Sequence, residues 1–139
     1  MSIPDFVDMR WLTLLFVLVL GGCNTEWQHN RERNEIAYSA VPANYKADIL
    51  SFMRTYLNDP SGVRDAFLSE PSQQTIEGTS RYASCLRYNA KKTGGQYAGS
   101  KDSLVLFRGG RLDRVVDNAR ERCRDAAYKP FPELERLGR

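Results

Sequence analysis

The sequence is poor in histidine and cysteine, the residues that most often hold transition metals or carry nucleophilic catalysis. It contains one histidine and three cysteines in 139 residues. A single histidine excludes catalysis by histidine pairs and most histidine-rich metal sites, and no cysteine or histidine pair stands at zinc-ligand spacing. The length and hydropathy also exclude a multidomain enzyme, a long repeat array and a polytopic membrane protein. We therefore expect no metal and no cofactor.

The sequence also lacks a large excess of positive or of negative charge. The formal net charge is +3, with 20 Lys and Arg against 17 Asp and Glu. Composition alone thus gives no strong sign of a polyanion-binding protein. What the chain does contain is 42% apolar and 11% aromatic residues. Most of it is therefore expected to fold, as one domain with a modest core.

The longest apolar run is too short to cross a membrane. It covers residues 11–20 and follows Arg10. Ten helical residues rise about 15 Å, roughly half the thickness of the hydrocarbon layer. A run of this length behind a positive residue is typical of a signal peptide.

The next residues resemble the lipobox of bacterial lipoprotein precursors. Leu20 is followed by two small residues, Gly21 and Gly22, and then by Cys23. In such precursors the cysteine thiol takes a diacylglycerol, and the chain is cut just before it, here between Gly22 and Cys23. We therefore expect residues 1–22 to be a lipoprotein signal peptide and Cys23 to be the lipidated residue. An ordinary secretion signal or a short uncleaved anchor is the alternative.

Two details refine the N-terminus. Asp5 and Asp8 are unusual before the apolar run of a signal peptide, so translation from Met9 is an alternative to translation from Met1. Asn24 follows the candidate lipidation site. In enterobacterial lipoproteins an aspartate there favours the inner membrane, so Asn24 predicts an outer-membrane lipoprotein that faces the periplasm. The first expected partner is the lipid bilayer, in which several acyl chains, palmitate among them, would anchor the protein.

The remaining chain divides into a tether and a domain. Residues 23–43 are polar and mixed in charge, which predicts a flexible tether with His29 as one of its solvated residues. Residues 44–139 are predicted to be a small periplasmic domain. It begins with a helix that Asn44 can cap, because apolar residues recur at helical spacing from residue 45 to residue 57.

The pattern of the domain changes from helical to extended after Pro60. The predicted strands are residues 63–69, 81–90, 103–108 and 111–116, with a helical turn over 64–68 as the alternative in the first. In the second, alternation places Leu86 and Tyr88 on one face of the sheet and Ala83 and Cys85 on the other. Gly109 and Gly110 predict a two-residue hairpin turn between the last two. Capping-box spacing of Asn118 and Glu121 predicts a short helix over 118–127, followed by a tail packed through Phe131 and Leu134. The expected fold is α+β, with an N-terminal helix, three or four antiparallel strands and a short C-terminal helix.

The odd number of cysteines is resolved if Cys23 carries a lipid. Cys85 and Cys123 then remain as a candidate disulfide, which the oxidising periplasm allows. The pairing requires the C-terminal helix to cover the sheet face that carries Cys85. Two independent buried thiols are an alternative. A reactive cysteine is a second alternative, disfavoured because there is no CxxC motif and no histidine partner.

Arginines are concentrated late in the chain and form a candidate arginine patch. Its members are Arg108, Arg111, Arg114, Arg120 and Arg124. They are suited to an anionic partner such as lipid A phosphates, peptidoglycan carboxylates or an acidic protein surface. Interleaved acidic residues, Asp113 and Asp117 among them, favour an ordinary salt-bridged surface instead. Nucleic acid is not expected, because of the export signal and the mixed charge.

Several segments are similar to a family of small alphaproteobacterial envelope lipoproteins. They are YKADIL at 45–50, YLNDPSGVR at 56–64, SEP at 69–71, CLRYNA at 85–90, YAGSKD at 97–102 and AYKPFPEL at 127–134. The resemblance spans residues 42–137. It implies the envelope setting and the domain boundaries, and it implies no activity and no catalytic residues.

These observations predict a lipid-anchored, non-catalytic binding or structural module of the cell envelope, with an envelope protein or an anionic polymer as its partner. One alternative is a small envelope hydrolase that uses carboxylates such as Asp113 and Asp117. Another is an inhibitor of an envelope hydrolase that acts through the loop at 97–102. A deep pocket lined by acids with displaced pKa values favours the hydrolase, and a flat surface bearing aromatic residues favours the binding module.

Overall fold

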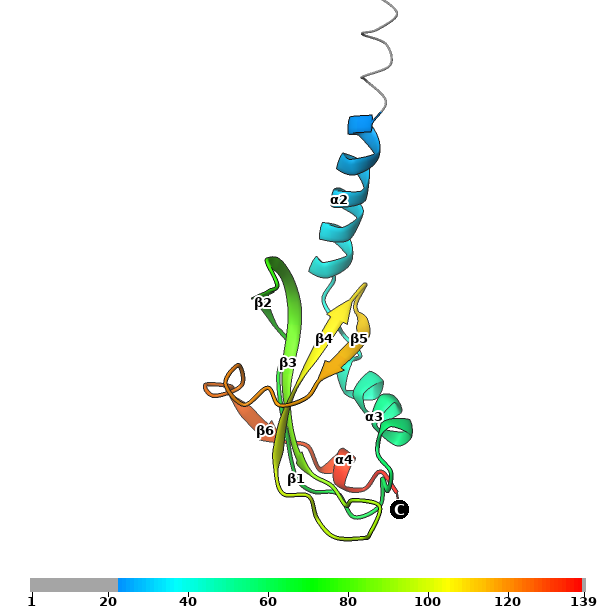
Figure 1. Cartoon of the computed structure of the whole chain (residues 1–139), viewed down its shortest axis with the longest axis vertical. Coiled ribbons are helices and arrows are strands. Elements are labelled where there is room, and N and C mark those ends of the chain that lie inside the picture. The colour runs from blue at the N-terminus through cyan, green and yellow to red at the C-terminus, as the bar shows by residue number, and fades with distance from the viewer. Residues whose placement is uncertain (1–22, 139) are drawn as a thin grey trace, which may run out of the picture. The chain divides into compact units, whose positions relative to one another are not determined.

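The computed structural model describes residues 23–138, so the predicted signal peptide lies outside the described residues. The chain separates after Glu35 into two compact units. The second unit contains all the strands that the structure describes (Figure 1). No helix within residues 23–138 has both the length and the apolar character that crossing a membrane requires.

Helix α2, Cys23–Ser39, occupies most of the segment predicted to be a tether. Residues 26–35, including His29, are exposed on every side of the helix. Over these residues the helix buries no face against a core, and even Trp27 is 77% exposed. The predicted tether is thus largely helical, and its role as a spacer stays a prediction.

Helix α3, Tyr45–Tyr56, is the predicted first helix of the domain. Ile49 and Met53, four residues apart, are both fully buried, which confirms the apolar stripe. The Asn44 side chain makes no capping hydrogen bond. Its carbonyl oxygen instead accepts the Asp48 N–H at 3.1 Å.

The domain contains one antiparallel sheet of six strands, in the order β5-β4-β3-β1-β6, with β2 paired to β3 off this path. The strands are β1 Arg64–Ser69, β2 Ser72–Ile76, β3 Thr79–Asn89, β4 Lys101–Arg108, β5 Arg111–Val116 and β6 Tyr128–Pro130. Strand β3 is long enough for its first half to pair with β2 and its second half with β1. The α+β class and the four predicted strands are confirmed, whereas β2 and β6 were not predicted.

The turn between β4 and β5 is the two-residue turn predicted from the sequence. Gly109 and Gly110 have φ values of 60° and 73°, which residues with a side chain rarely adopt. Space is also limited there, because a Cβ atom at Gly110 would lie 3.2 Å from the carbonyl oxygen of Val41. Both the backbone conformation and this close approach therefore favour glycine.

The sheet has an apolar cluster on each face. Leu86 and Tyr88 of β3 pack on the face that α3 and the short helix α4, Pro132–Glu135, cover. Ala83 and Cys85 of the same strand pack on the opposite face. The predicted alternation of β3 is therefore confirmed. Figure 1 shows α3 and α4 on one side of the sheet and the segment before β6, in orange, on the other.

The prediction of a helix over residues 118–127 is wrong. The segment consists of turns, and Asn118 has a φ of 58°, a left-handed conformation that a helix N-cap does not use. The short C-terminal helix is α4, which follows β6. Phe131 and Leu134 are 1% and 0% exposed, which confirms that the tail packs on the domain through these two residues.

Candidate functional site

The candidate lipidation site lies at the edge of the described chain. Cys23 is the first residue of α2, and its side chain is not among those described. Its partner in the predicted cleavage, Gly22, lies outside the described residues. Lipidation at Cys23 therefore stays a prediction from the sequence.

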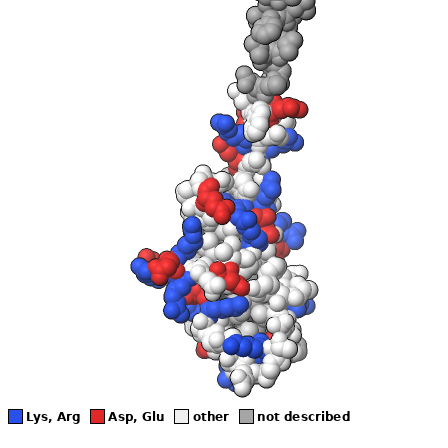
Figure 2. All heavy atoms as spheres, in the orientation of Figure 1, with Lys and Arg blue, Asp and Glu red and all other residues white. Residues whose placement is uncertain are grey.

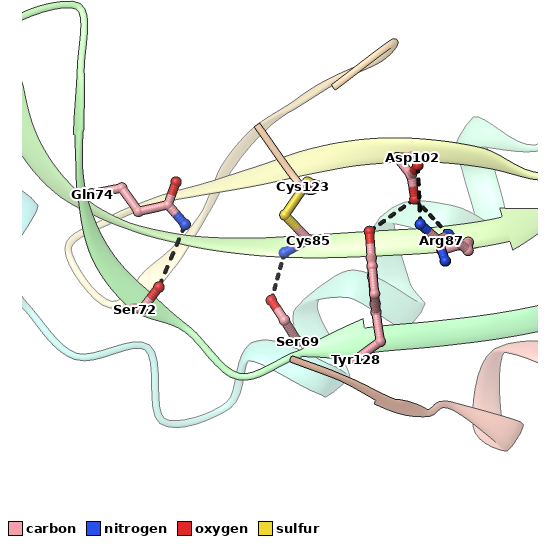
Figure 3. The surroundings of a disulfide bond; sticks show 8 residues. All are labelled: Ser69, Ser72, Gln74, Cys85, Arg87, Asp102, Cys123 and Tyr128. Atoms are coloured by element: carbon pink, nitrogen blue, oxygen red, sulfur yellow. Dashed lines mark hydrogen bonds and ion pairs between the residues drawn. A yellow bond between two sulfur atoms is a disulfide. The ribbon is translucent and has the colours of Figure 1, made fainter. Parts of the chain in front are cut away.

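Cys85 and Cys123 form a disulfide pair in the structure. Their sulfur atoms lie 2.01 Å apart and their Cα atoms 5.7 Å apart. Cys123 reaches Cys85 from the turns of residues 117–127, which cover this sheet face in place of the predicted helix (Figure 3). Both cysteines are buried, at 2% and 0% exposure, so the disulfide lies in the second apolar cluster and not at an accessible redox site.

A buried carboxylate next to the disulfide joins three strands. Asp102 of β4 accepts hydrogen bonds from Arg87 of β3, at 2.7 and 3.3 Å, and from the Tyr128 hydroxyl of β6, at 2.8 Å (Figure 3). The Arg87 guanidinium also lies 4.4 Å from the centre of the Tyr128 ring. The carbonyl oxygen of Asp102 accepts the N–H of Ala119, which ties the covering turns to the same position. We call Asp102, Arg87 and Tyr128 the Asp102 cluster.

The electrostatics of the Asp102 cluster are those of a structural ion pair. Burial raises the pKa of Asp102, but hydrogen bonds from Arg87 and Tyr128 and the nearby positive charges outweigh it, so the pKa is lowered. Burial and the hydrogen bond to Asp102 raise the pKa of Tyr128. The carboxylate thus stays ionised and the phenol stays protonated. Neither group is poised to exchange a proton near neutral pH.

A second network surrounds Asp117, just after β5. Its carboxylate accepts the Tyr56 hydroxyl at 2.5 Å and the Ser103 hydroxyl at 2.9 Å, and the Lys101 ammonium lies 3.5 Å away. Burial raises the pKa of Asp117, yet these hydroxyls and the lysine outweigh it and lower the pKa. The hydrogen bond to Asp117 raises the pKa of Tyr56 to about 12. The network fixes the end of α3 against the start of β4.

An open hollow of about 530 Å³ lies beside this network, where the end of α3, the loop after β3 and the start of β4 meet. Its lining includes Tyr56, Asn58, Lys91, Lys92, Thr93 and Lys101, and contains no acidic residue. We call it the lysine hollow. Three lysines around a hollow of this size form a candidate site for an anionic ligand.

Two acids that are not part of the lining pair with lysines of the hollow. Asp59 lies 3.9 Å from Lys91, and Asp117 lies 3.5 Å from Lys101. Lys92 is exposed and forms no ion pair with any residue that the structure describes. Both ion pairs are longer than a direct hydrogen bond, and the Lys101 ammonium also lies 5.2 Å from the centre of the Tyr88 ring.

The candidate arginine patch is not one continuous basic surface. Arg111 pairs with Asp48 at 2.8 Å, Arg114 pairs with Glu77 at 3.3 Å, and Arg124 pairs with Glu121. Arg108 faces the Tyr38 ring, and Arg120 contributes its charge to Asp102. Figure 2 shows acidic and basic side chains interspersed over the visible face. This arrangement favours the salt-bridged surface over the anion-binding patch.

The carboxylates named for the hydrolase alternative do not face a common ligand. Asp113 binds Arg81 at 3.0 Å, whereas Asp117 binds the hydroxyls of Tyr56 and Ser103. Every carboxyl group with a displaced pKa in the described chain is shifted downward, the opposite of a general acid. The structure thus gives no support to a carboxylate hydrolase.

The loop named for the inhibitor alternative is held against the domain at both ends. The Tyr97 hydroxyl donates to the carbonyl oxygen of Gly62 at 2.8 Å, and the Arg64 guanidinium lies 4.2 Å from the centre of the Tyr97 ring. Asp102, at the other end, is buried in its cluster. Tyr97 and Asp102 hold the two ends of the loop on the domain and are therefore not available to enter the active site of another protein.

The lysine hollow was not predicted from the sequence. The sequence does contain one indication of this hollow, the Lys91-Lys92 pair. It stands directly before Thr93-Gly94-Gly95 and so places two cations at the start of a loop. What the sequence could not indicate is that α3 ends beside this loop and that Lys101 lies opposite Tyr88 in the sheet. Comparison with family models, curated proteins and solved structures gave no match to this chain.

Proposed function

We propose that the protein is a lipid-anchored, non-catalytic binding module of the bacterial cell envelope, attached to the outer membrane and facing the periplasm. The sequence from Leu20 to Cys23 supports the anchor. The lysine hollow supports binding over hydrolysis, because its lining contains three lysines and no carboxyl group. Hydrolysis by carboxylates needs an acid with a raised pKa beside a second carboxylate, and the hollow offers neither.

An anchor gives a small binding module a high local concentration. A protein held at one membrane meets its partner in a thin layer and not in the whole periplasm, so a weak site can still be occupied. The polar helix α2 follows the candidate lipidation site directly. Its exposed residues 26–35 are suited to a spacer between lipid and domain.

The anchor is tested by metabolic labelling with palmitate. We expect the native chain to incorporate label and Cys23→Ala to incorporate none. A Thr25→Ala variant, changed two residues away, is expected to keep the label. Undiminished labelling of Cys23→Ala would refute the anchor.

A separate measurement tests the binding role. Crosslinking in intact cells, followed by mass spectrometry of the captured material, is expected to recover an envelope protein or glycan. The disposition of the domain is tested in parallel by protease treatment of intact and of permeabilised cells. Recovery of no envelope component counts against the binding module even if the anchor is present.

A further inference from the structure

The charges around the lysine hollow do not cancel. Lys91, Lys92 and Lys101 line it, and Asp59 and Asp117 are the acids paired with two of them. Three ammonium groups against two carboxylates leave one positive charge in excess. Burial lowers the pKa of Lys101, but Tyr88 and Asp117 outweigh it and raise the pKa, so this lysine is charged at neutral pH.

The two ion pairs are also easily exchanged. Lys91 and Lys101 have side chains that are 28% and 37% exposed, and their distances to the acids are 3.9 and 3.5 Å. Pairs of this length and exposure contribute little to stability, so little ion-pair energy is lost when a lysine turns toward another anion. Lys101 in addition lies over the rings of Tyr56 and Tyr88, which fix its position beside the hollow. The acids have other hydrogen-bond partners besides the lysines. Asp59 accepts the backbone N–H of Ser61 at 2.8 Å, and Asp117 accepts two hydroxyls.

The rest of the lining is neither strongly apolar nor strongly acidic. Asn58 and Thr93 offer neutral donors and acceptors, and the ring of Tyr56, 40% exposed, offers an apolar surface. One face of that ring is stacked on Phe52, with 5.1 Å between centroids, which fixes its orientation. Neutral hydrogen-bonding groups beside a fixed ring are suited to a ligand that carries hydroxyl groups on a compact frame.

We propose that the lysine hollow binds an anionic sugar unit of an envelope glycan, with its ammonium groups on the carboxylate or phosphate of that sugar. The inference gives the proposed binding module its ligand class and rests on that proposal. The volume of about 530 Å³ accommodates one such unit. Because the hollow is open, the remainder of the glycan chain can extend into solvent.

The test is a titration of the protein, purified in neutral detergent, with three sugars that differ in charge. The neutral probe is N-acetylglucosamine, the carboxylate probe is N-acetylmuramic acid and the phosphate probe is N-acetylglucosamine 6-phosphate. Binding is followed by NMR through the backbone amide signals of Thr93 and Gly99. We expect at least one charged sugar to bind, at least tenfold more tightly than the neutral one, with weaker binding at higher salt. The probe that binds identifies the anion.

Lysine variants locate the binding. Lys101→Met and Lys92→Met are each expected to weaken it about tenfold, since each removes a charged hydrogen-bond donor. Lys92 is exposed and has no ion pair in the described chain, so its replacement leaves the fold intact. Lys129→Met is the matched control, because this lysine pairs with Glu70 outside the hollow. It is expected to bind like the native protein.

Three results would overturn the proposal: equal binding of the neutral sugar, no binding of either charged sugar, or an equal loss in Lys129→Met and the hollow variants. The titration does not require the lipid. It therefore fails or succeeds independently of palmitate labelling and of crosslinking in cells, which test the proposed function.

Discussion

Replacing both Cys85 and Cys123 with alanine is expected to lower the free energy of unfolding by about 3–4 kcal/mol. The cysteines are 38 residues apart, and closing a loop of that length restricts the unfolded chain by roughly this amount. The pair also fixes the turns of residues 117–127 over the second apolar cluster. For a domain of about 100 residues the midpoint of thermal unfolding should fall by about 12 °C or more.

The measurement is urea unfolding of the oxidised protein, the reduced protein and the double alanine variant. The reduced protein and the variant should resemble each other and differ from the oxidised form. Thiol titration of the unfolded, unreduced protein provides the control and should find neither Cys85 nor Cys123 free. Two free thiols, or equal stability of oxidised and reduced protein, would contradict the disulfide.

The second large effect is expected from Asp102→Asn. The variant keeps the shape of the side chain but removes the charge that Arg87 and Tyr128 surround, and it leaves Arg87 without its ionic partner. We expect a loss of about 2–3 kcal/mol at pH 7, because hydrogen bonds to a buried charge are lost while Arg87, at 39% exposure, remains partly hydrated. Glu70→Gln is the matched control. Its ion pair with Lys129 is 67% exposed on both sides, so its loss should change stability far less than Asp102→Asn does.

The effect of Asp102→Asn should depend on pH in one direction. The pKa of Asp102 is lowered below the usual 3.8. Its stabilising contribution is therefore complete above the unfolded value and is lost as the pH falls through the folded one. The stability difference between native and variant protein should be constant above about pH 5 and shrink below about pH 4. Urea unfolding over this range checks the prediction, and a difference that does not change with pH contradicts it.

Elements with a strong local pattern were predictable from the sequence. The stripe of α3, the alternation of β3 and the Gly109-Gly110 hairpin each follow from periodicity or from a backbone conformation that glycine tolerates. Strands β2 and β6 were missed because neither carries such a pattern. Strand β2 is SQQTI, almost entirely polar, and β6 has three residues and ends in Pro130. Both depend on a partner strand that only the folded chain provides.

The error at residues 118–127 has a specific cause. Alanines and Cys123 at helical spacing, behind a capping box, predict a helix when the segment is considered alone. In the fold the segment makes two long-range connections instead, the disulfide to Cys85 and the hydrogen bond from Ala119 to Asp102. These tertiary contacts override the helix preference of the segment. Because its turns contain no glycine, the sequence gives no local sign of them.

The anionic partner stays a prediction, and the structure offers the lysines of the hollow for it in place of the arginines. The arginines are close in the sequence, but four of the five meet an acid or an aromatic ring of their own. Lys91 and Lys92 are adjacent in the sequence, and the pairing of β3 with β4 brings Lys101 to the same hollow, beside the end of α3.

We propose that the mature protein begins at a lipidated Cys23. Mass spectrometry of the intact protein, extracted from membranes, tests it most directly. The predicted result is the mass of residues 23–139 with a diacylglycerol and an amide-linked acyl chain on Cys23, less two hydrogens for the disulfide. The mass of a chain that begins at Met1 or at Met9, or of any chain that carries no acyl groups, would contradict this proposal.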